Sequence, residues 1–235
     1  MLGIATPAHN EQAVIVDCLV AAKKAAEHPR LQGEAVEILV VLDQCTDLTP
    51  AHVARAQVSS LEIRARNVGV ARARGAEEML ARGACWLAFT DADIQVAPEW
   101  LADQLALEAD VVCGTVAVND WSAYGAHAEL LQWHFAQTYT DADGHRHIHG
   151  ANLGVGAIAY RAASGFPHLA CSEDVALVEA LQTNGAGIAW SARPRVVTSA
   201  RRVARIQGGF ADALLDAVTQ RLNNCASESS NAAIK

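Results

Sequence analysis

Two kinds of apolar pattern alternate along the first half of the chain. Short runs are almost continuously apolar, as in strands buried on both faces, whereas longer segments carry apolar residues at the spacing of helices. This alternation predicts strands joined by crossover helices into a mostly parallel sheet of the α/β class. The predicted strands are 2–6, 36–42, 58–65 and 84–90, and the predicted helices are 12–27, a segment from about 49, and 69–82.

The second half of the chain has fewer strand-like runs and more aromatic and histidine residues. No linker rich in Pro, Gly or Ser separates the halves, so we expect a single domain over 1–222, made of the halves 1–118 and 119–222. Apolar residues at helical spacing predict a packed helix over 210–222. The polar, small-residue segment 223–235 is expected to be a disordered tail.

The composition narrows the class of protein. Hydrophobic residues make up 51% and charged residues 19%, which is a globular balance, and the net charge is −8. Without a block of Lys and Arg, nucleic-acid polymers are poor candidates as partners. No leader pattern and no apolar run of about 20 residues is present, and the six cysteines are widely spaced. We therefore expect a soluble, cytoplasmic protein with reduced thiols and no transmembrane segment.

Polar groups follow three of the predicted strands: PAHNE, DQCTD and DAD. Ligands in open α/β sheets bind beyond the carboxyl ends of the strands, so these groups are expected to converge on one site. In a turn, Asp91 and Asp93 can both reach one ligand, and carboxylate with phosphate oxygens is the usual ligand set of Mg²⁺ or Mn²⁺. The simplest alternative is a helix-capping Asp91 and a solvated Asp93, which is the commoner case for an isolated Asp-x-Asp.

The order of PAHNE, DQCTD, NVGVARARG, DAD, GAN and SED, over roughly residues 3–200, resembles family 2 glycosyltransferases. The resemblance implies the GT-A fold, a Rossmann-like, mostly parallel sheet flanked by helices, with a smaller mixed region on the acceptor side. It also implies that 1–118 bind a nucleotide-sugar donor, and that 119–222 bind the acceptor and supply the catalytic base.

Donor contacts follow from the resemblance position by position. Pro7, Asn10 and Glu11 match the segment that holds the nucleobase and ribose of the donor. Asp43 matches the acid that hydrogen-bonds the base, and a buried carboxylate that accepts from a ring N–H would discriminate between bases. The resemblance therefore implies that the ends of the first two strands form the nucleoside pocket.

The segment NVGVARARG matches the part of the family that supplies a basic residue near the diphosphate. On a helix Arg72 and Arg74 would point about 200° apart, so at most one of them faces the donor. We favour Arg72, although a solvated arginine on a helix face is equally compatible with the pattern. Later in the chain, TSARR is similar to an ending found in some soluble family members, which implies that the guanidinium of Arg202 could clamp the diphosphate.

The resemblance also implies the metal ligands and the base. Asp93 is expected to contact Mg²⁺ or Mn²⁺ directly, and Asp91 to contact the ribose, the metal or a metal-bound water, so that the metal neutralises the departing diphosphate. The SED motif places Ser172 at a helix N-cap and implies that Asp174, beside Glu173, is the general base. Alternatively, Glu173 and Asp174 are first-turn acids favoured by the helix dipole.

The motif GAN matches the loop that lines the sugar and acceptor, which implies acceptor contacts for Gly150, Ala151 and Asn152. Glycine at Gly150 would let the backbone approach a ligand closely. The preceding HRHIHG carries three alternating histidines. Because no Cys or Glu stands at ligand spacing, loop histidines beside an acceptor site are a better interpretation than a zinc site.

The sequence thus predicts a metal-dependent, inverting glycosyltransferase that moves one sugar from a nucleotide-sugar to a hydroxyl of a small-molecule, glycan or lipid-linked acceptor. One alternative is a nucleotidyltransferase, but TPAHNEQ lacks the Gly-rich, basic loop expected after its first strand. Another is a non-catalytic nucleotide-sugar-binding protein, which the presence of Asp91, Asp93 and Asp174 disfavours. The residues leave open the donor sugar, the nucleobase, the acceptor and the oligomeric state.

Overall fold

The computed structural model describes residues 1–199, which form two compact units. The first unit comprises residues 1–117 and 141–198, and the second includes residues 118–140. The first unit therefore joins residues from both of the halves that the sequence suggests. The predicted helix 210–222, the tail 223–235 and Arg202 lie outside the described residues.

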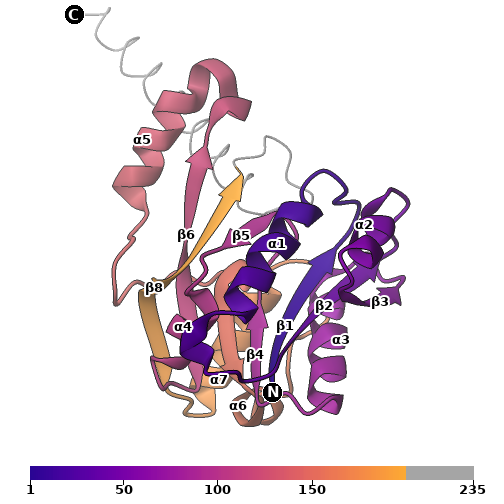
Figure 1. The fold of residues 1–235 in the computed structure, drawn as a ribbon. Coiled ribbons are helices and arrows are strands. Elements are labelled where there is room, and N and C mark those ends of the chain that lie inside the picture. The colour runs from indigo at the N-terminus through magenta and orange to yellow at the C-terminus, as the bar shows by residue number, and fades with distance from the viewer. Residues whose placement is uncertain (200–235) are drawn as a thin grey trace, which may run out of the picture. The chain divides into compact units, whose positions relative to one another are not determined.

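An eight-stranded sheet in the order β3-β2-β1-β4-β7-β6-β8-β5 is the framework of the described residues (Figure 1). Strands β1 to β4 pair in parallel, and β7 pairs antiparallel with both β4 and β6, as β5 does with β8. The strands are β1 (Leu2–Ala8), β2 (Val36–Asp43), β3 (Ser59–Ile63), β4 (Trp86–Phe89), β5 (Ile94–Val96), β6 (Val111–Asp120), β7 (Leu153–Gly156) and β8 (Ile188–Ser199). The predicted α/β class and its parallel sheet are confirmed.

Helices cover both faces of the parallel part of the sheet, which explains the continuous apolar runs. Ile4 packs with residues of α1 and α4, whereas its neighbour Ala5 packs with residues of α3 and α7 on the other face. The helices are α1 (Ile15–Ala26), α2 (Thr49–Arg55), α3 (Val68–Ala81), α4 (Trp100–Leu105), α5 (Ala128–Thr138), α6 (Ala157–Ala162) and α7 (Glu173–Thr183), with 3-10 turns η1 (Pro29–Leu31), η2 (Ser122–His127) and η3 (Gly150–Asn152).

Two predicted element ends are wrong for a common reason. The first helix begins at Ile15, because the amides of Glu11 and Gln12 donate to the side chains of Thr49 (2.7 Å) and Asp47 (3.1 Å). The third strand, predicted to reach residue 65, ends at residue 63, because the amides that follow turn toward a carboxylate at the end of β2. In both places a side chain that is distant in the sequence accepts a hydrogen bond from a backbone amide at or next to the end of the predicted helix or strand.

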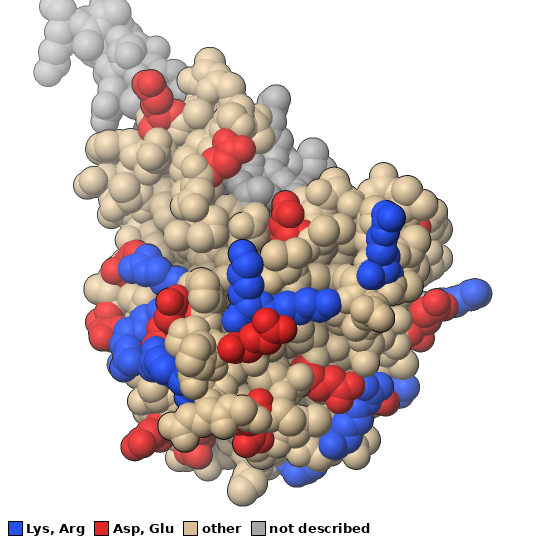
Figure 2. Space-filling model, in the orientation of Figure 1, with Lys and Arg blue, Asp and Glu red and all other residues tan. Residues whose placement is uncertain are grey.

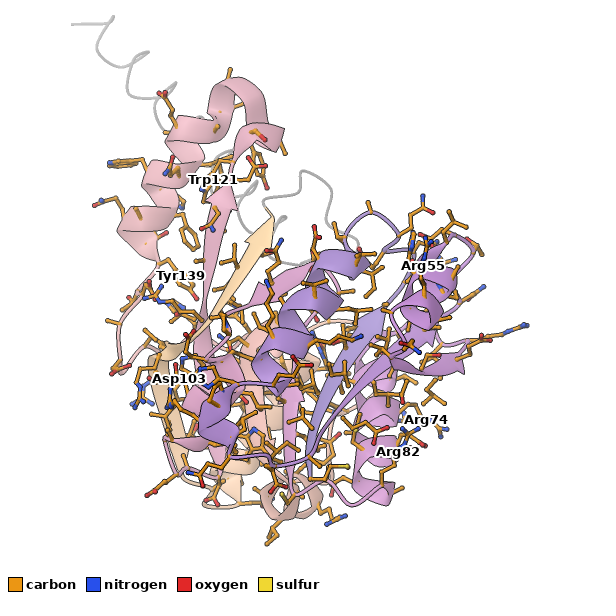
Figure 3. All side chains as sticks on the ribbon, in the orientation of Figure 1. Arg55, Arg74, Arg82, Asp103, Trp121 and Tyr139 are labelled. Carbon is orange, nitrogen blue, oxygen red and sulfur yellow. The ribbon has the colours of Figure 1, made fainter. Side chains whose placement is uncertain are left out.

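The second unit contains η2 and α5 and has a small aromatic core of its own. The ring of Phe135 packs against Trp121 at 5.7 Å and stacks on Tyr139 at 4.6 Å between centroids. Trp121 and Tyr139 are labelled in Figure 3. Phe135 and Tyr139 are four residues apart, so they lie on the same side of the chain at the end of α5. This cluster accounts for part of the aromatic enrichment in the second half of the sequence, whereas the three histidines of HRHIHG lie in the first unit.

Charged residues of both signs are interspersed on the face of the molecule shown in Figure 2. Surface ion pairs among the described residues include Arg82 with Glu78 at 2.8 Å and Arg195 with Asp141 at 2.8 Å. Pairs exposed in this way contribute little to stability. Among residues 1–199, no helix combines the length and the apolarity that crossing a membrane requires.

Candidate active site

The Asp91–Asp93 segment forms a turn between β4 and β5, as predicted. The amide of Ile94 donates to the Asp91 carbonyl at 3.1 Å, and the buried thiol of Cys18 donates to the same carbonyl at 3.4 Å. Both aspartates are half-buried, and the side chain of Asp91 is 35% exposed. The turn therefore presents two neighbouring carboxylates at the carboxyl edge of the parallel strands.

Asp43 ends β2 and is buried. Its carboxylate accepts hydrogen bonds from three successive amides, those of Ala65 and Arg66 on Oδ1 (2.8 and 2.9 Å) and that of Asn67 on Oδ2 (2.9 Å). Arg66 has a φ of 47°, which turns these N–H groups toward one point. Asp43 thus anchors the loop between β3 and α3, and its predicted contact with a nucleobase stays a prediction.

The segment after β1 is tied to the segment after β2. Asn10 accepts from the Thr46 amide at 2.7 Å, and the amide of the buried Glu11 donates to the hydroxyl of Thr49 at 2.7 Å. Pro7, in the last part of β1, is half-buried. The structure therefore brings together the residues predicted to hold the nucleoside, at and just beyond the ends of the adjacent parallel strands β1 and β2, while their roles stay predictions.

Only one of the two candidate arginines faces the aspartate turn. Arg72 lies on the inner face of α3 and is 5% exposed, whereas Arg74 is 53% exposed and pairs with Glu77 at 3.5 Å (Figure 3). Nη2 of Arg72 donates to Oδ1 of Asp91 at 2.5 Å, and Nη1 donates to Oε1 of Glu173. The expectation that the two arginines diverge is confirmed, and Arg72 connects the Asp91 turn with the start of α7.

Glu173 and Asp174 begin α7 but point to different partners. Glu173 is 3% exposed and pairs with Arg72, while the half-buried Asp174 accepts the Gly150 amide on Oδ2 at 2.6 Å. Ser172 occupies the N-cap as predicted, but with a φ of 58° and no side-chain hydrogen bond to the helix. Because a buried Arg72 holds Glu173, Asp174 is the acid of this pair that is better placed to take a proton.

Gly150 lies between the guanidinium and the base candidate. A Cβ atom at this position would lie 2.4 Å from Cζ of Arg72, so no other residue fits without displacing the arginine. Its amide meanwhile donates to Asp174. The half-buried Ala151 follows it in η3. Acceptor contacts for both residues stay predictions, but the need for glycine is clear from the packing.

Asn152 is fully buried, and its side chain makes three hydrogen bonds within the protein. Its Oδ1 accepts from the indole of Trp100 at 2.8 Å, and its Nδ2 donates to the carbonyls of Thr115 (2.8 Å) and Pro194 (2.9 Å). These bonds join η3 to α4, β6 and β8. The structure thus shows a packing role for this side chain, and its predicted contact with an acceptor stays a prediction.

We expect Asn152→Ala to lower the free energy of unfolding by about 3 kcal/mol, because it leaves three buried polar groups without partners. Urea unfolding followed by circular dichroism measures this loss. Asn184→Ala is the matched control, since the exposed amide of Asn184 makes one hydrogen bond, to the Ala162 carbonyl at 2.9 Å. Equal effects of the two substitutions would contradict the packing role.

The three histidines of HRHIHG stack on one another in irregular backbone. The ring centroids of His145 and His147 are 5.5 Å apart, and those of His147 and His149 are 6.0 Å apart. Burial and the neighbouring His147 lower the pKa of His149 to about 4, although the Asp174 carboxylate acts in the opposite direction. His149 is therefore a neutral ring at pH 7 in the electrostatic field of the base candidate.

Asn67 is a site residue that the sequence analysis did not single out. Its side chain caps α3 by accepting the Val70 amide at 3.0 Å, and its Nδ2 donates to the His168 carbonyl at 3.2 Å. The capping role could have been predicted from the sequence, because an Asn before a helical pattern is a typical N-cap. The second joins residues 101 positions apart and needs the fold.

The two carboxylates of the Asp91–Asp93 turn fit a divalent cation that keeps part of its hydration shell. Among residues 1–199, no group of three or more His, Cys, Asp and Glu side chains is arranged to hold a metal ion. Mg²⁺ in nucleotide sites needs only one or two protein carboxylates, because phosphates and waters complete its shell. Asp91 and Asp93, half-buried in one turn, match that requirement.

Comparisons with solved structures agree with this architecture. The S. aureus TarS fragment 1–349 in complex with UDP-GlcNAc has a TM-score of 0.64 at 17% identity, over 89% of this chain and 61% of that chain. The mannosyltransferase PcManGT from Pyrobaculum calidifontis, in complex with GDP-Man and Mn²⁺, has a TM-score of 0.60 at 18% identity, over 86% and 57% of the two chains. The chain thus spans about 60% of these proteins, and the likeness shows the GT-A fold.

No curated protein matches the sequence. The sequence model of glycosyl transferase family 2, however, matches residues 4–160 of the 235, and so covers most of β1, the Asp91–Asp93 turn and the Gly150–Asn152 loop. The end of β1 and the Asp91–Asp93 turn lie at the carboxyl edge of the parallel strands. With the GT-A fold, this match shows that the chain belongs to glycosyl transferase family 2.

Proposed function

We propose that this chain is a metal-dependent, inverting hexosyltransferase that moves a single sugar from a nucleotide-sugar to a hydroxyl acceptor. The observation that carries the proposal is the pairing of Arg72 with both Asp91 and Glu173. This buried link brings the turn proposed to hold the donor next to the helix proposed to carry the base. A donor carbon and an acceptor hydroxyl could therefore meet between Asp91 and Asp174.

In the proposed reaction, Asp174 removes the proton of the acceptor hydroxyl. The acceptor oxygen forms a bond to the anomeric carbon while the bond from that carbon to the diphosphate oxygen breaks, and the nucleoside diphosphate leaves with the electron pair. This single displacement inverts the anomeric configuration. The alternative base, Glu173, is paired with Arg72 and buried, so it is not available for the proton.

Asp93 and Asp91 would hold Mg²⁺ or Mn²⁺, which would neutralise the charge that develops on the leaving diphosphate. Pro7, Asn10, Glu11 and Asp43 would hold the nucleoside. TarS with UDP-GlcNAc or UDP, and PcManGT with GDP-Man and Mn²⁺, support a nucleotide-sugar donor and a divalent metal. The five described cysteines are free thiols, which supports the proposed cytoplasmic location.

The acceptor side of the proposal rests on the surroundings of Asp174. Gly150 and Ala151 would line the acceptor pocket, and the neutral ring of His149 could exchange hydrogen bonds with acceptor hydroxyls without a charge of its own. Arg202 would clamp the diphosphate. The family match leaves a nucleotidyltransferase without support, and a non-catalytic nucleotide-sugar-binding protein is the remaining alternative.

We expect UDP or GDP to raise the melting temperature of the protein in the presence of Mn²⁺ or Mg²⁺, and to have little effect in the presence of EDTA. Thermal unfolding with a panel of nucleoside diphosphates measures this. Slow release of the nucleoside diphosphate from the matching nucleotide-sugar then separates an enzyme from a binding protein. Metal-independent binding would overturn the role given to the Asp91–Asp93 turn.

A further inference from the structure

The segment between α6 and α7, residues 163–172, carries the chain to the proposed base without regular secondary structure. It ends at Ser172, which has a φ of 58°, a conformation that is unfavourable for a residue other than glycine. Local backbone preference therefore does not explain where Glu173 and Asp174 lie. Contacts with other elements have to hold them, and α3 supplies three of these contacts.

All three contacts come from the first two turns of α3. The side chain of its N-cap, Asn67, donates to the His168 carbonyl at 3.2 Å, and the Gly69 amide donates to the Leu169 carbonyl at 3.1 Å. A Cβ atom at Gly69 would lie 2.5 Å from that same carbonyl oxygen, so the two backbones approach as closely as glycine allows. One turn further along, Arg72 pairs with Glu173.

Arg72 is the contact that also reaches the donor side. Its guanidinium lies 6.0 Å from the ring centroid of Phe166, and close to the backbone at Gly150. It donates one Nη to Asp91 and the other to Glu173, so its planar fork sets the distance between the two carboxylates. A lysine at this position would keep the positive charge, but its single ammonium group lacks the two separate nitrogen atoms with which arginine binds the two carboxylates.

We propose that Arg72 is a positioning residue that holds the proposed base at a set distance from the donor turn, with Asn67 and Gly69 as its supports on α3. This rests on the proposed role of Asp174. Arg72 acts through Glu173, which precedes the base, and through Asp91, which is one of the two proposed metal ligands. The hydrogen bond between the Gly150 amide and Asp174 depends on the same arrangement, because Gly150 packs against the guanidinium.

The test removes the guanidinium of Arg72 together with one carboxylate, so that the net charge of the site does not change. Arg72→Gln alone would leave the buried carboxylate of Glu173 without its ion-pair partner, so the informative protein is the double variant R72Q/E173Q. Arg74→Gln on the exposed side of the same helix is the matched control. Hydrogen exchange at the Gly150 amide reports the position of Asp174 without any need for substrate, and transfer or donor hydrolysis reports the consequence.

We expect R72Q/E173Q to stay folded, to exchange the Gly150 amide about tenfold faster, and to lose about 100-fold in kcat. Binding of UDP or GDP with Mn²⁺ should weaken far less, because Asp91 and Asp93 remain. R72K should fold and still lose most of kcat, whereas R74Q should match the parent protein. Normal exchange and normal kcat in the double variant would overturn the proposal, because Arg72 would then only neutralise Glu173.

The two proposals fail in different ways. If the parent protein binds no nucleoside diphosphate and releases none from a nucleotide-sugar, the proposed function fails, while exchange at Gly150 still tests the role of Arg72. If the parent protein is active and R72Q/E173Q has unchanged exchange and rate, the positioning role fails and the proposed function stands. If R72Q/E173Q does not fold, R72K supplies the same two readouts.

Discussion

Asp174→Asn is expected to lower the rate of sugar transfer by about 1000-fold and to leave the binding of a nucleoside diphosphate unchanged. Positioned general bases commonly contribute about 10² to 10⁴ to a rate, and an amide cannot take the acceptor proton. Asparagine has the shape of aspartate, and its single side-chain oxygen can still accept one of the two amides that Asp174 binds, Gly150 on Oδ2 at 2.6 Å and Val175 on Oδ1 at 2.8 Å. The loss should therefore appear in kcat.

The measurement pairs steady-state transfer with calorimetric binding of UDP or GDP in Mn²⁺. Glu179→Gln is the matched control, because Glu179 is an exposed acid on the same helix, α7. It should leave both transfer and binding at the parent level. Equal losses of transfer and nucleotide binding in Asp174→Asn would mean that Asp174 supports the structure, and would point away from a base at this position.

Asp93→Asn is expected to weaken Mn²⁺-dependent binding of a nucleoside diphosphate by about 100-fold, or about 2.7 kcal/mol. Asparagine keeps one neutral oxygen but removes the charge that attracts a divalent cation. Asp91→Asn should weaken binding as well and should in addition release Arg72, which it holds at 2.5 Å. The two variants should therefore differ in kcat after correction for occupancy.

Calorimetric titration of UDP or GDP with and without EDTA measures this prediction. In EDTA the parent protein and Asp93→Asn should bind equally weakly, because the metal is then absent from both. Asp17→Asn, an exposed acid in the first turn of α1, is the matched control and should bind like the parent protein. A parent-like affinity of Asp93→Asn in Mn²⁺ would exclude a direct metal contact by Asp93.

The different orientations of the Arg72 and Arg74 side chains on α3 show what a local sequence pattern can predict and what it cannot. A two-residue offset on a helix was enough to predict that one arginine at most faces the site. Which side chains Arg72 meets was not predictable, because Asp91 and Glu173 lie 19 and 101 residues further along the chain. Sequence reasoning assigned Arg72 to the donor diphosphate, whereas the structure shows it between two carboxylates.

For Asp43 and Asn152 too, the sequence identified the residue, but only the structure identified its hydrogen-bond partners. Both were singled out from the sequence by motif, and both were assigned to ligands. The structure shows Asp43 accepting three loop amides and Asn152 joining α4, β6 and β8. Buried polar side chains need partners, but the identity of those partners depends on elements that only the folded chain brings close.

The elements β5, α4 and β6 were not predicted, whereas the α/β class, the strands β1 to β4, the helices α1 to α3, the turn at Asp91–Asp93 and the family were predictable from the sequence alone. These follow from short-range periodicity and from motifs, in which each residue is informative beside its neighbours. The contacts by which α3 connects the Asp91–Asp93 turn with the start of α7, and the place of Gly150 beside both Arg72 and Asp174, were known only from the folded chain. These contacts join residues far apart in the chain, and their distances depend on how helices pack on the sheet.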